Sequence, residues 1–349
     1  MNDLVQTALR TVVAGQTLDV TAADAFMNEW MQGRVTQAQA AALVSVMAAR
    51  GEQPSEIAGF ARAMRRHALH ITAPASAIDT CGTGGDGRDT FNISTTVAFI
   101  AATAGIPVAK HGNRAASSRS GSADVLQALG AEIELSTEAC ERLLADTNLC
   151  FLFAQVFHPA MKYAAQVRRE LGFRTIFNIL GPLTNPANAR RQVLGVFKPS
   201  LVPTVADALL ELGAEHALVV HGDGGLDELS LSGPTQVAEV RAGRIETYVI
   251  SPEEVGLVRA PVSSITGGTP AENADMIRKV LQGVKGPKRD VVLLNAGAAL
   301  YVGGKAASIA EGVDLAAQLI DSGAALAKLE QFVAGTQDHA QSVQAGEVH

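Results

Sequence analysis

The chain contains few of the residues on which small secreted or zinc-bound proteins depend. Its 349 residues include three cysteines, Cys81, Cys140 and Cys150, and no two of them form a CxxC pair. This wide spacing argues against a zinc ribbon and against a disulfide scaffold. Aromatic residues make up only 4% of the chain. We therefore expect small aliphatic side chains to form most of the core.

An excess of positive charge is also absent. Lys and Arg number 28 against 35 Asp and Glu, which gives a formal net charge of −7. A protein that binds nucleic acid mainly through its net field carries the opposite balance, so we expect no nucleic-acid partner. Charged residues make up 18% of the chain and apolar residues 47%, a balance that excludes general disorder.

No segment suits export or membrane insertion. The first residues, Met-Asn-Asp-Leu, lack the basic start and apolar stretch of a signal peptide. The charge-free stretch 90–109 reaches membrane-spanning length, but it contains Gly105, Pro107 and several hydroxyl side chains, which do not suit a helix that faces hydrocarbon. We expect a soluble, cytoplasmic protein with reduced thiols and no membrane partner.

The length predicts two domains, because 349 residues are more than one compact core usually absorbs. The first seventy or so residues have an all-helical pattern, with Thr21, Thr36 and Ser55 as candidate N-caps and Gly51 as a stop signal. Helices this short need partners. The pattern therefore implies a small helical domain or an oligomer interface.

From residue 77 onward, short apolar runs alternate with helical segments. The runs are 106–109, 149–154, 193–197 and 217–220, and the helical segments include 137–146 and 201–212. This alternation predicts an α/β fold with a mostly parallel sheet and helices on its faces. Segments 235–240 and 244–249 are joined through Ala242-Gly243, which predicts a hairpin.

The densest chemical signal is a glycine-rich loop. Gly82, Gly84 and Gly87 satisfy G-x-G-x-x-G, but no Asp or Glu occurs between residues 90 and 123. A dinucleotide site needs an acidic residue about twenty positions on, so the Rossmann interpretation fails. Gly304-Lys305 lacks the other residues of a Walker A loop. An anion cradle and a plain tight turn remain as interpretations of the glycine loop.

The next segment favours the anion cradle. Residues Asn92-Ile-Ser-Thr95 stand directly before an apolar helix. Free backbone N–H groups at a helix N-terminus, beside Ser and Thr hydroxyls, suit a phosphate. Ordinary N-capping by Ser94 or Thr95 is the alternative. The closeness of this helix start to the glycine loop favours anion binding.

A loop of hydrogen-bond donors follows the strand-like run 106–109. Residues 110–118 combine Lys110, His111 and Arg114 with amide and hydroxyl groups, and they include no acidic residue. Solvated loops usually mix charges of both signs, so this composition predicts polyanion binding rather than an ordinary surface loop.

Two adjacent carboxylates, Asp227 and Glu228, follow the strand-like run 217–220. Oxygen ligands of this kind suit Mg²⁺ when the ion also holds substrate phosphates. Alone, the pair could be an exposed acidic turn, but beside a polyanion site recruitment of Mg²⁺ is the better interpretation. Both carboxylates are expected to be ionised at neutral pH.

Together these motifs resemble those of the anthranilate phosphoribosyltransferases, over nearly the whole chain except the part after about residue 332. They are Gly82-Thr-Gly-Gly-Asp86, Thr90-Phe-Asn-Ile-Ser-Thr95, Lys110-His-Gly-Asn-Arg114 with Ser117-Ser118, Ser120-Gly-Ser-Ala-Asp124, Val167-Arg-Arg-Glu-Leu-Gly172, Arg174-Thr-Ile-Phe-Asn178, Leu180-Gly-Pro-Leu-Thr-Asn-Pro186 and Asp227-Glu228. The sequence does not depart from the family pattern inside these motifs.

The resemblance implies a nucleoside phosphorylase-like phosphoribosyltransferase fold and a homodimer that associates through its helical domain. Residues 1–72 and a return segment, 158–188, would form the helical domain. Residues 73–157 and 189–332 would form the α/β domain, and residues 333–349 would be a flexible tail.

The resemblance also implies the reaction and its residues. The phosphoribosyl group of phosphoribosyl pyrophosphate would pass to the amine of anthranilate in tryptophan biosynthesis, with Mg²⁺ as cofactor and Lys110, Asp227 and Glu228 as catalytic residues. Anthranilate would lie near Gly82, Asn113 and Arg168, and Mg²⁺ would bind Ser94, Asp227 and Glu228. Phosphoribosyl pyrophosphate would bind Gly82, Gly85, Asp86, Thr90, Asn92, Ile93, Ser94, Thr95, Lys110, His111, Gly112, Asn113, Arg114, Ala115, Ala116, Ser117, Ser118 and Ser122.

Two other functions stay open at this point. A nucleoside phosphorylase of the same fold would bind inorganic phosphate and a nucleoside, but the context of Arg168 and the pair Asp227-Glu228 disfavour it. A nucleic-acid-binding relative without catalysis would need basic surface excess, which the net charge of −7 disfavours.

Overall fold

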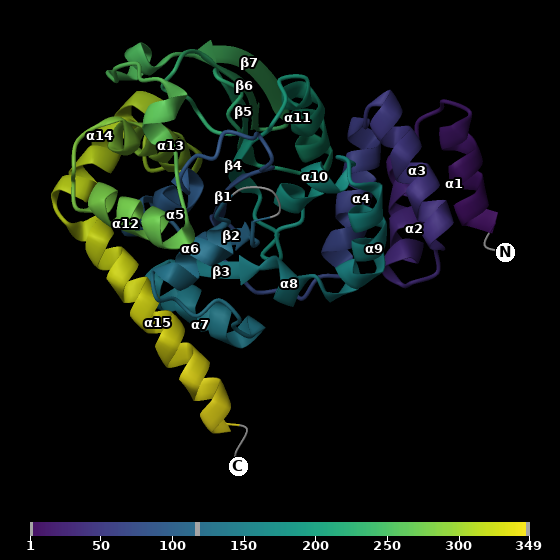
Figure 1. Cartoon of the computed structure of the whole chain (residues 1–349), viewed down its shortest axis with the longest axis horizontal. Helices are drawn as coiled ribbons and strands as arrows, with labels where there is room; N and C mark the ends of the chain where they lie inside the picture. The colour runs from purple at the N-terminus through teal and green to yellow at the C-terminus, as the bar shows by residue number, and fades with distance from the viewer. Residues whose placement is uncertain (1–2, 116–118, 347–349) are drawn as a thin grey trace.

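The computed structural model describes residues 3–115 and 119–346. A helical bundle at the N-terminal end lies beside a larger α/β body, and the last helix runs along the far side of that body (Figure 1). The bundle consists of α1 (Asp3–Val13), α2 (Val20–Met31), α3 (Gln37–Arg50) and α4 (Pro54–Arg66).

Local hydrogen bonds explain where the bundle helices begin. Thr36 caps α3 as predicted: its hydroxyl accepts from the Gln39 N–H at 3.3 Å, and the Gln39 side chain accepts from the Thr36 N–H at 3.0 Å. The other two predicted caps are wrong. Asp19 caps α2 in place of Thr21, and α4 begins at Pro54, so that the Ser55 hydroxyl donates to the Leu18 carbonyl.

Part of the chain returns to this bundle after the third strand. The returning elements are α8 (Ala154–Phe157), η1 (Pro159–Met161), α9 (Lys162–Leu171), α10 (Phe177–Leu180) and η2 (Gly181–Leu183). Helix α9 packs against α2 and α3. The indole N–H of Trp30 donates to the Tyr163 carbonyl at 3.2 Å, and the Trp30 ring meets Phe177 edge-on at 5.1 Å. Tertiary packing therefore joins segments more than a hundred residues apart.

A seven-stranded sheet forms the centre of the α/β body, in the order β3-β2-β1-β4-β5-β6-β7. The strands from β3 to β5 are parallel, and β6 and β7 extend the sheet in antiparallel pairing. The predicted mostly parallel sheet is thus confirmed. The strands are β1 (Ile78–Gly82), β2 (Val108–Gly112), β3 (Leu149–Phe153), β4 (Arg191–Gly195), β5 (His216–Gly222), β6 (Thr235–Arg241) and β7 (Arg244–Ile250).

The predicted hairpin is confirmed as β6 and β7. Ala242 and Gly243 both have positive φ, 49° and 77°, as a two-residue turn with the right twist for a hairpin requires.

Helices cover both faces of the sheet. They are α5 (Ile93–Thr103), α6 (Ser122–Ala128), α7 (Thr137–Thr147), α11 (Leu201–Glu211), α12 (Pro270–Leu281), α13 (Pro287–Val302), α14 (Ile309–Asp321) and α15 (Ala324–Gly346), with short turns η3 (Pro252–Val255) and η4 (Val262–Ile265). One apolar core contains α5, α7, α13 and α14. The other contains α11 and continues without a break into the helical bundle. The bundle and one face of the sheet therefore share a core.

The predicted flexible tail is wrong for residues 333–340, which continue α15. Thr336 is fully buried and its hydroxyl accepts from the Glu132 N–H at 3.0 Å, while the Gln337 side chain donates to the Gly130 carbonyl at 2.8 Å. Gly335 allows the close approach, since a Cβ there would lie 2.8 Å from a methyl group of Leu143. The small residues of this segment indicate close helix packing rather than fraying.

All three cysteines are buried free thiols. In the described part of the chain, no helix is both long enough and apolar enough to cross a membrane.

Candidate active site

Four neighbouring parallel strands, β2, β1, β4 and β5, each end in glycine. A Cβ on Gly82 would lie 2.4 Å from the Asp227 carboxylate, and one on Gly195 would lie 1.6 Å from the Asp227 carbonyl oxygen. At Gly222 it would meet the Glu228 carbonyl at 2.4 Å, and at Gly112 the Ser122 hydroxyl at 2.2 Å. The strand ends thus lack side chains because other parts of the site occupy that space.

The segment after β5 brings the predicted carboxylate pair to these strand ends. Gly224 and Gly225 have φ near +80°, which turns the chain back so that Asp227 faces the glycine loop after β1. The Gly84 N–H donates to the Asp227 carboxylate at 2.6 Å. Asp227 is 9% exposed, so the alternative of an exposed acidic turn is wrong for this residue.

Burial changes the expected ionisation of the pair. Burial and the nearby Asp86 raise the pKa of Asp227 to about 7, against the effect of the Gly84 N–H, and burial together with Asp227 raises the pKa of Glu228 well above its usual value. Burial and the neighbouring acids therefore oppose the ionisation that the sequence alone predicts for this pair. One oxygen of Asp86 is buried without a hydrogen-bond partner among the described residues. Three crowded acids of this kind suit a site that receives a cation.

Lys110, in the middle of β2, is close enough to Glu228 to interact with its charge. It is 3% exposed, and its ammonium donates to the Thr80 carbonyl and to the Ser94 hydroxyl, the latter at 3.3 Å. Burial lowers its pKa, while Asp79 and Glu228 act to raise it. Lys110 therefore supplies positive charge to the site, and its hydrogen bonds to Thr80 and Ser94 fix the position of the ammonium.

Sequence reasoning missed the support around Lys110. Asp79 is fully buried, and its carboxylate accepts from the Asn185 amide at 2.7 Å and from the His111 N–H at 3.3 Å. Burial raises the pKa of Asp79 to about 6, although Lys110 lowers it. Asn185 stands inside a quoted motif and Asp79 does not, and only the fold shows that the two residues join β1, β2 and the return segment.

The start of α5 faces the site mainly with its backbone. Ile93 and Thr95 are each 1% exposed, so their side chains belong to the core. The Asn92 side chain accepts from the Asn273 amide at 2.8 Å and donates to the Ser120 carbonyl at 3.2 Å. Thr90 forms a bridge with Thr266. These contacts hold the first residues of α5 in place, so that the helix start presents backbone groups to the site.

The loop after β2 is less purely a donor loop than its composition suggests. The Asp124 carboxylate, on α6, accepts from the N–H groups of Ala115 and Gly121 at 3.0 and 2.9 Å and pairs with Arg114 at 3.1 Å. The Asn113 carbonyl accepts from the Ser122 hydroxyl at 3.3 Å. Part of the predicted cation set is therefore neutralised. The predicted residues Ala116, Ser117 and Ser118 lie outside the described residues.

His111 points from β2 toward the return segment. Its ring lies 5.0 Å from that of His158, and its Nδ1 is 3.1 Å from the Gly181 carbonyl oxygen. Burial lowers the pKa of His111 to about 3 and that of His158 to about 4. Both Nε2 atoms are buried without a partner in the described structure. Neutral imidazoles thus line the join between the α/β body and the return segment.

The return segment brings two arginines to this region. Arg168, on α9, lies with its guanidinium 5.3 Å from the centre of the Phe177 ring, and surrounding protein lowers its pKa although the residue remains exposed. Arg174 lies 4.4 Å from the centre of the Phe197 ring and donates to the Gly85 carbonyl. Arg174 therefore ties the return segment to the glycine loop, a contact that sequence reasoning missed.

The donor set is compatible with Mg²⁺ but does not form a complete protein cage. Within residues 3–115 and 119–346, no three His, Cys, Asp or Glu side chains surround a common point as metal ligands would. Mg²⁺ usually takes one or two carboxylates and completes its shell with substrate phosphates and water. The carboxylates of buried Asp227 and half-buried Glu228, the latter beside Ser94, fit such a partial site.

The chain belongs to a glycosyl transferase family with a helical bundle domain and an α/β domain. Residues 6–68 match the "Glycosyl transferase family, helical bundle domain", and residues 74–326 match the "Glycosyl transferase family, a/b domain".

Within that class, the chain belongs to the anthranilate phosphoribosyltransferase family. It is 54% identical to the anthranilate phosphoribosyltransferase of Rubrobacter xylanophilus, over 95% of this chain and 97% of the relative. It is also 54% identical to that of Thermomicrobium roseum, over 94% and 96%. The family predicted from the motifs is thereby confirmed.

Solved structures agree. Anthranilate phosphoribosyltransferase from Thermus thermophilus superimposes with a TM-score of 0.90 at 48% identity, covering 95% of this chain and 99% of the other. The Saccharomyces cerevisiae enzyme in complex with PRPP and Mg has a TM-score of 0.87 at 27% identity, over 97% and 99%. The two-part fold predicted from the sequence is confirmed.

Proposed function

We propose that the strand-end groups are the active site of this enzyme. The chain transfers the phosphoribosyl group of phosphoribosyl pyrophosphate to the amine of anthranilate, giving N-(5-phosphoribosyl)anthranilate and pyrophosphate in tryptophan biosynthesis, and it uses Mg²⁺. The observation that carries the site is the convergence of Asp227, Glu228, Ser94 and Lys110 at the ends of β1, β2, β4 and β5.

The donor occupies the glycine loop, the start of α5 and the loop after β2. This assignment comprises the eighteen predicted residues from Gly82 to Ser122, of which Ile93 and Thr95 contribute backbone groups only. Free N–H groups at the start of a helix favour phosphate oxygens. Glycines at the strand ends let backbone and ligand approach closely.

Breaking the bond between ribose C1 and pyrophosphate leaves positive charge on the ribose and negative charge on the departing group. The protein acts by holding the reactants in line and stabilising the departing charge. Mg²⁺, held by Ser94, Asp227 and Glu228, would supply positive charge at the pyrophosphate oxygens. Lys110 adds positive charge, and its ammonium also fixes the Ser94 hydroxyl. The aromatic amine is already a nucleophile, so a strong general base is not required.

Anthranilate lies between the α/β body and the return segment, near Gly82, Asn113 and Arg168. Arg168 binds its carboxylate, because a guanidinium fork matches the two oxygens. The neutral rings of His111 and His158 make this side suitable for an aromatic acid. The Saccharomyces cerevisiae relative has been solved in complex with 4-fluoroanthranilate.

A steady-state assay tests the function directly. Loss of anthranilate fluorescence should require both phosphoribosyl pyrophosphate and Mg²⁺, and pyrophosphate should appear in equal amount. A nucleoside phosphorylase would instead release a free base from a nucleoside and inorganic phosphate. A binding module would turn over neither pair.

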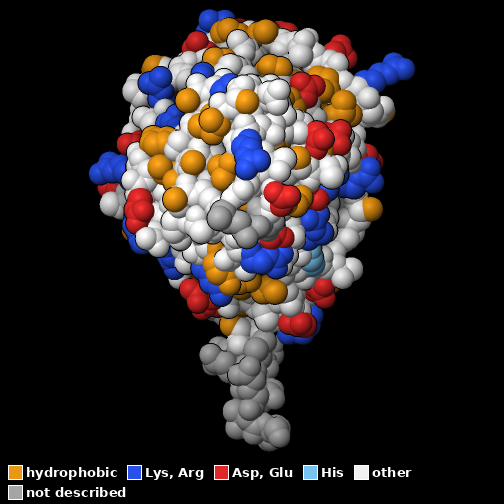
Figure 2. Space-filling view, turned by 90° about the vertical axis from the view of Figure 1, so that its right-hand side faces the viewer, with side chains coloured by type: hydrophobic (Ala, Val, Ile, Leu, Met, Phe, Trp, Pro, Cys, Tyr) orange, Lys and Arg blue, Asp and Glu red, His pale blue; other side chains and the backbone are white. Residues whose placement is uncertain are grey.

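We also propose a homodimer that associates through α1, α3 and α9. These helices pack on one another, and exposed apolar side chains lie on α1 and α9 or just beyond, at Val13, Tyr163 and Phe173. Figure 2 views this end of the molecule and shows hydrophobic side chains among charged ones. Light scattering should give the mass of a dimer for the wild type. For Val13→Asp it should show dissociation to monomer at higher protein concentration than for the wild type. The cytoplasmic location and the domain limits given above stay predictions.

A further inference from the structure

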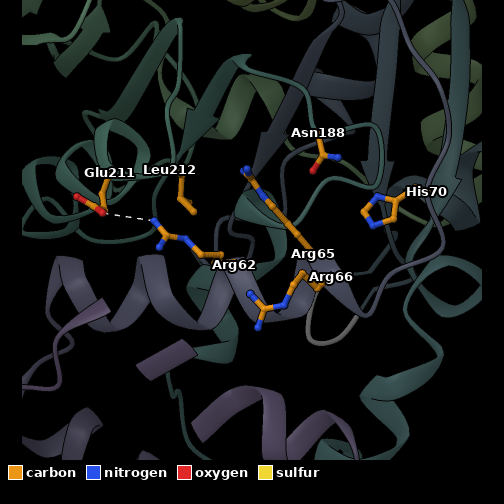
Figure 3. Close-up of a pocket in the computed structure, with 7 residues that line it drawn as sticks. All are labelled: Arg62, Arg65, Arg66, His70, Asn188, Glu211 and Leu212. Carbon is orange, nitrogen blue, oxygen red and sulfur yellow. Dashed lines mark hydrogen bonds and ion pairs between the residues drawn. The ribbon is translucent and has the colours of Figure 1, made fainter. Parts of the chain in front are cut away.

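A cavity of about 360 Å³ lies where α4 of the bundle meets the α/β body (Figure 3). Arg62, Arg65 and Arg66 of α4 line one side, His70 and Asn188 line another, and the end of α11 contributes Glu211. None of these residues belongs to the active site proposed above. The volume is in the range of pockets that hold small molecules.

The three arginines differ in how far their charge is compensated. Arg66 makes a two-pronged pair with Asp24 at 2.7 and 2.9 Å, and in Figure 3 it points away from Asn188. Arg62 pairs with Glu211 at 3.4 Å, and both side chains are close to half exposed. Such an exposed pair is weak and can exchange partners. Arg66 is therefore already paired with Asp24, whereas Arg62 can exchange Glu211 for a bound anion.

Arg65 is fixed and uncompensated. Its Nε donates to the Leu183 carbonyl at 2.8 Å, and no carboxylate of the described residues pairs with its two terminal amino groups. Burial lowers the pKa of Arg65 to about 10, and Arg62 adds to the effect. A partly buried guanidinium without a counter-charge is unfavourable unless an anion pairs with it.

Neutral polar groups face Arg65 across the cavity. Asn188 stands in a left-handed turn with φ of 50°, held by its N–H bond to the Asn185 carbonyl at 3.0 Å. His70 approaches the Pro186 carbonyl through Nδ1 at 3.2 Å, which leaves Nε2 for a ligand. In Figure 3 Asn188 and His70 lie on the side opposite Arg62.

We propose that this cavity is a second binding site, for a small phosphate-bearing molecule, with Arg65 and Arg62 as the donors that recognise its oxyanion. A planar fork with two free N–H groups matches a phosphate. The cavity has room beyond a single phosphate group. Because α4 belongs to the bundle and α11 to the α/β body, the ligand bridges the two parts of the molecule.

Calorimetric titration tests the site in solution with two probes, ribose 5-phosphate and inorganic phosphate, both without Mg²⁺. Beside any binding at the strand ends, which Arg65→Gln should leave unchanged, the wild type should show a class of binding that weakens about 10- to 100-fold in Arg65→Gln, as expected for loss of a charged hydrogen bond. Arg66→Gln removes the same charge from the same helix but should change affinity by less than about twofold, because Asp24 already holds Arg66. Tighter binding of ribose 5-phosphate than of phosphate would identify a metabolite as the source. Equal binding would identify free phosphate.

A crystal soaked in selenate locates the anion. An anomalous peak should lie between Arg65 and Asn188 in the wild type and vanish in Arg65→Gln, while any peak at the strand ends remains as an internal control. If Arg65→Gln does not fold, Arg62→Gln, an exposed position, should weaken binding several-fold. Absence of the peak, or equal affinities of the wild type, Arg65→Gln and Arg62→Gln, would overturn the proposal. A peak without an Arg65-dependent signal in solution would show an adventitious ion only and would overturn it equally.

Discussion

The two sides of the active site are built by different means. On the strand-end side, glycines leave room for Asp227 and Glu228, and these two acids crowd together with raised pKa values. On the return-segment side, aromatic rings hold arginines, and burial lowers the pKa values of two histidines. The first side is organised for a cation and phosphates, the second for an aromatic acid.

Because of this difference, we expect the two sides to tolerate amino-acid substitutions to different extents. At Gly195 and Gly222 the strand ends have no free volume, because the nearest neighbours are backbone atoms of Asp227 and Glu228 that cannot rotate away. The return segment contacts the α/β body through side chains that can partly readjust. We therefore expect the largest losses at the strand ends.

Gly195→Ala should have the largest effect. Its Cβ would lie 1.6 Å from the Asp227 carbonyl oxygen, so the carboxylate pair must move. Overpacking of this kind lowers the free energy of unfolding by about 1–3 kcal/mol, and kcat should fall by about 10²–10³-fold or more, as when a group that stabilises developing charge is lost. Gly181→Ala is the matched control, since nothing lies within 4 Å of its added Cβ and its φ is helical. Equal activity of the two variants would show that the strand ends are not tightly filled.

Arg168→Ala should raise the KM for anthranilate by about 10- to 100-fold, the loss expected for one charged hydrogen bond. If Arg168 binds the carboxylate equally in ground and transition states, kcat should change much less. Steady-state kinetics with each substrate varied in turn measures the split. An unchanged KM for anthranilate would rule out this assignment. Arg169→Ala, one residue along the same helix, is the control.

Arg174→Ala should raise the KM for the donor by about two- to tenfold, because one hydrogen bond to the glycine loop is lost. Arg174→Lys keeps the charge but not the guanidinium that lies over the Phe197 ring, so it should recover only part of the affinity. Full activity of both variants would mean that the contact with Gly85 does not position the loop.

The two histidines predict how stability depends on pH. In the folded protein the pKa of His158 is lowered to about 4 and that of His111 to about 3, so they bind fewer protons than in the unfolded chain, where the value is 6.5. Their stabilising contribution is present above pH 6.5 and is lost as pH falls below it, by about 1 kcal/mol per pH unit for each ring. Asp79, with its pKa raised to about 6, acts in the opposite direction below that pH. Urea unfolding at about pH 7 and pH 5.5 should show a smaller loss for His158→Gln than for wild type. The same loss in both would contradict the burial of a neutral ring.

Local signals allowed prediction of the helix cap at Thr36, the hairpin through Ala242-Gly243 and the glycine loop. Each depends on neighbours a few residues away. Other contacts join segments that are distant in sequence, so no local pattern contains them. They are the close approach of Asp227 to Gly195, the Asp79–Asn185 hydrogen bond and the hydrogen bond from Arg174 to Gly85. The predicted flexible tail is wrong at the end of α15 for a related reason, since the small residues there pack against α7 and the Gly130 turn, which are distant in sequence.

Donor binding with and without Mg²⁺ tests the central claim most directly, namely that the carboxylates at the strand ends hold the metal for pyrophosphate. Calorimetry should show wild-type affinity for phosphoribosyl pyrophosphate falling sharply in EDTA, while Glu228→Gln and Asp227→Asn bind weakly with Mg²⁺ and respond little to its removal. Both variants should lose about 10²–10³-fold in kcat. Undiminished donor affinity and full activity of the wild type in excess EDTA, or a double variant with wild-type Mg²⁺ dependence, would contradict the account.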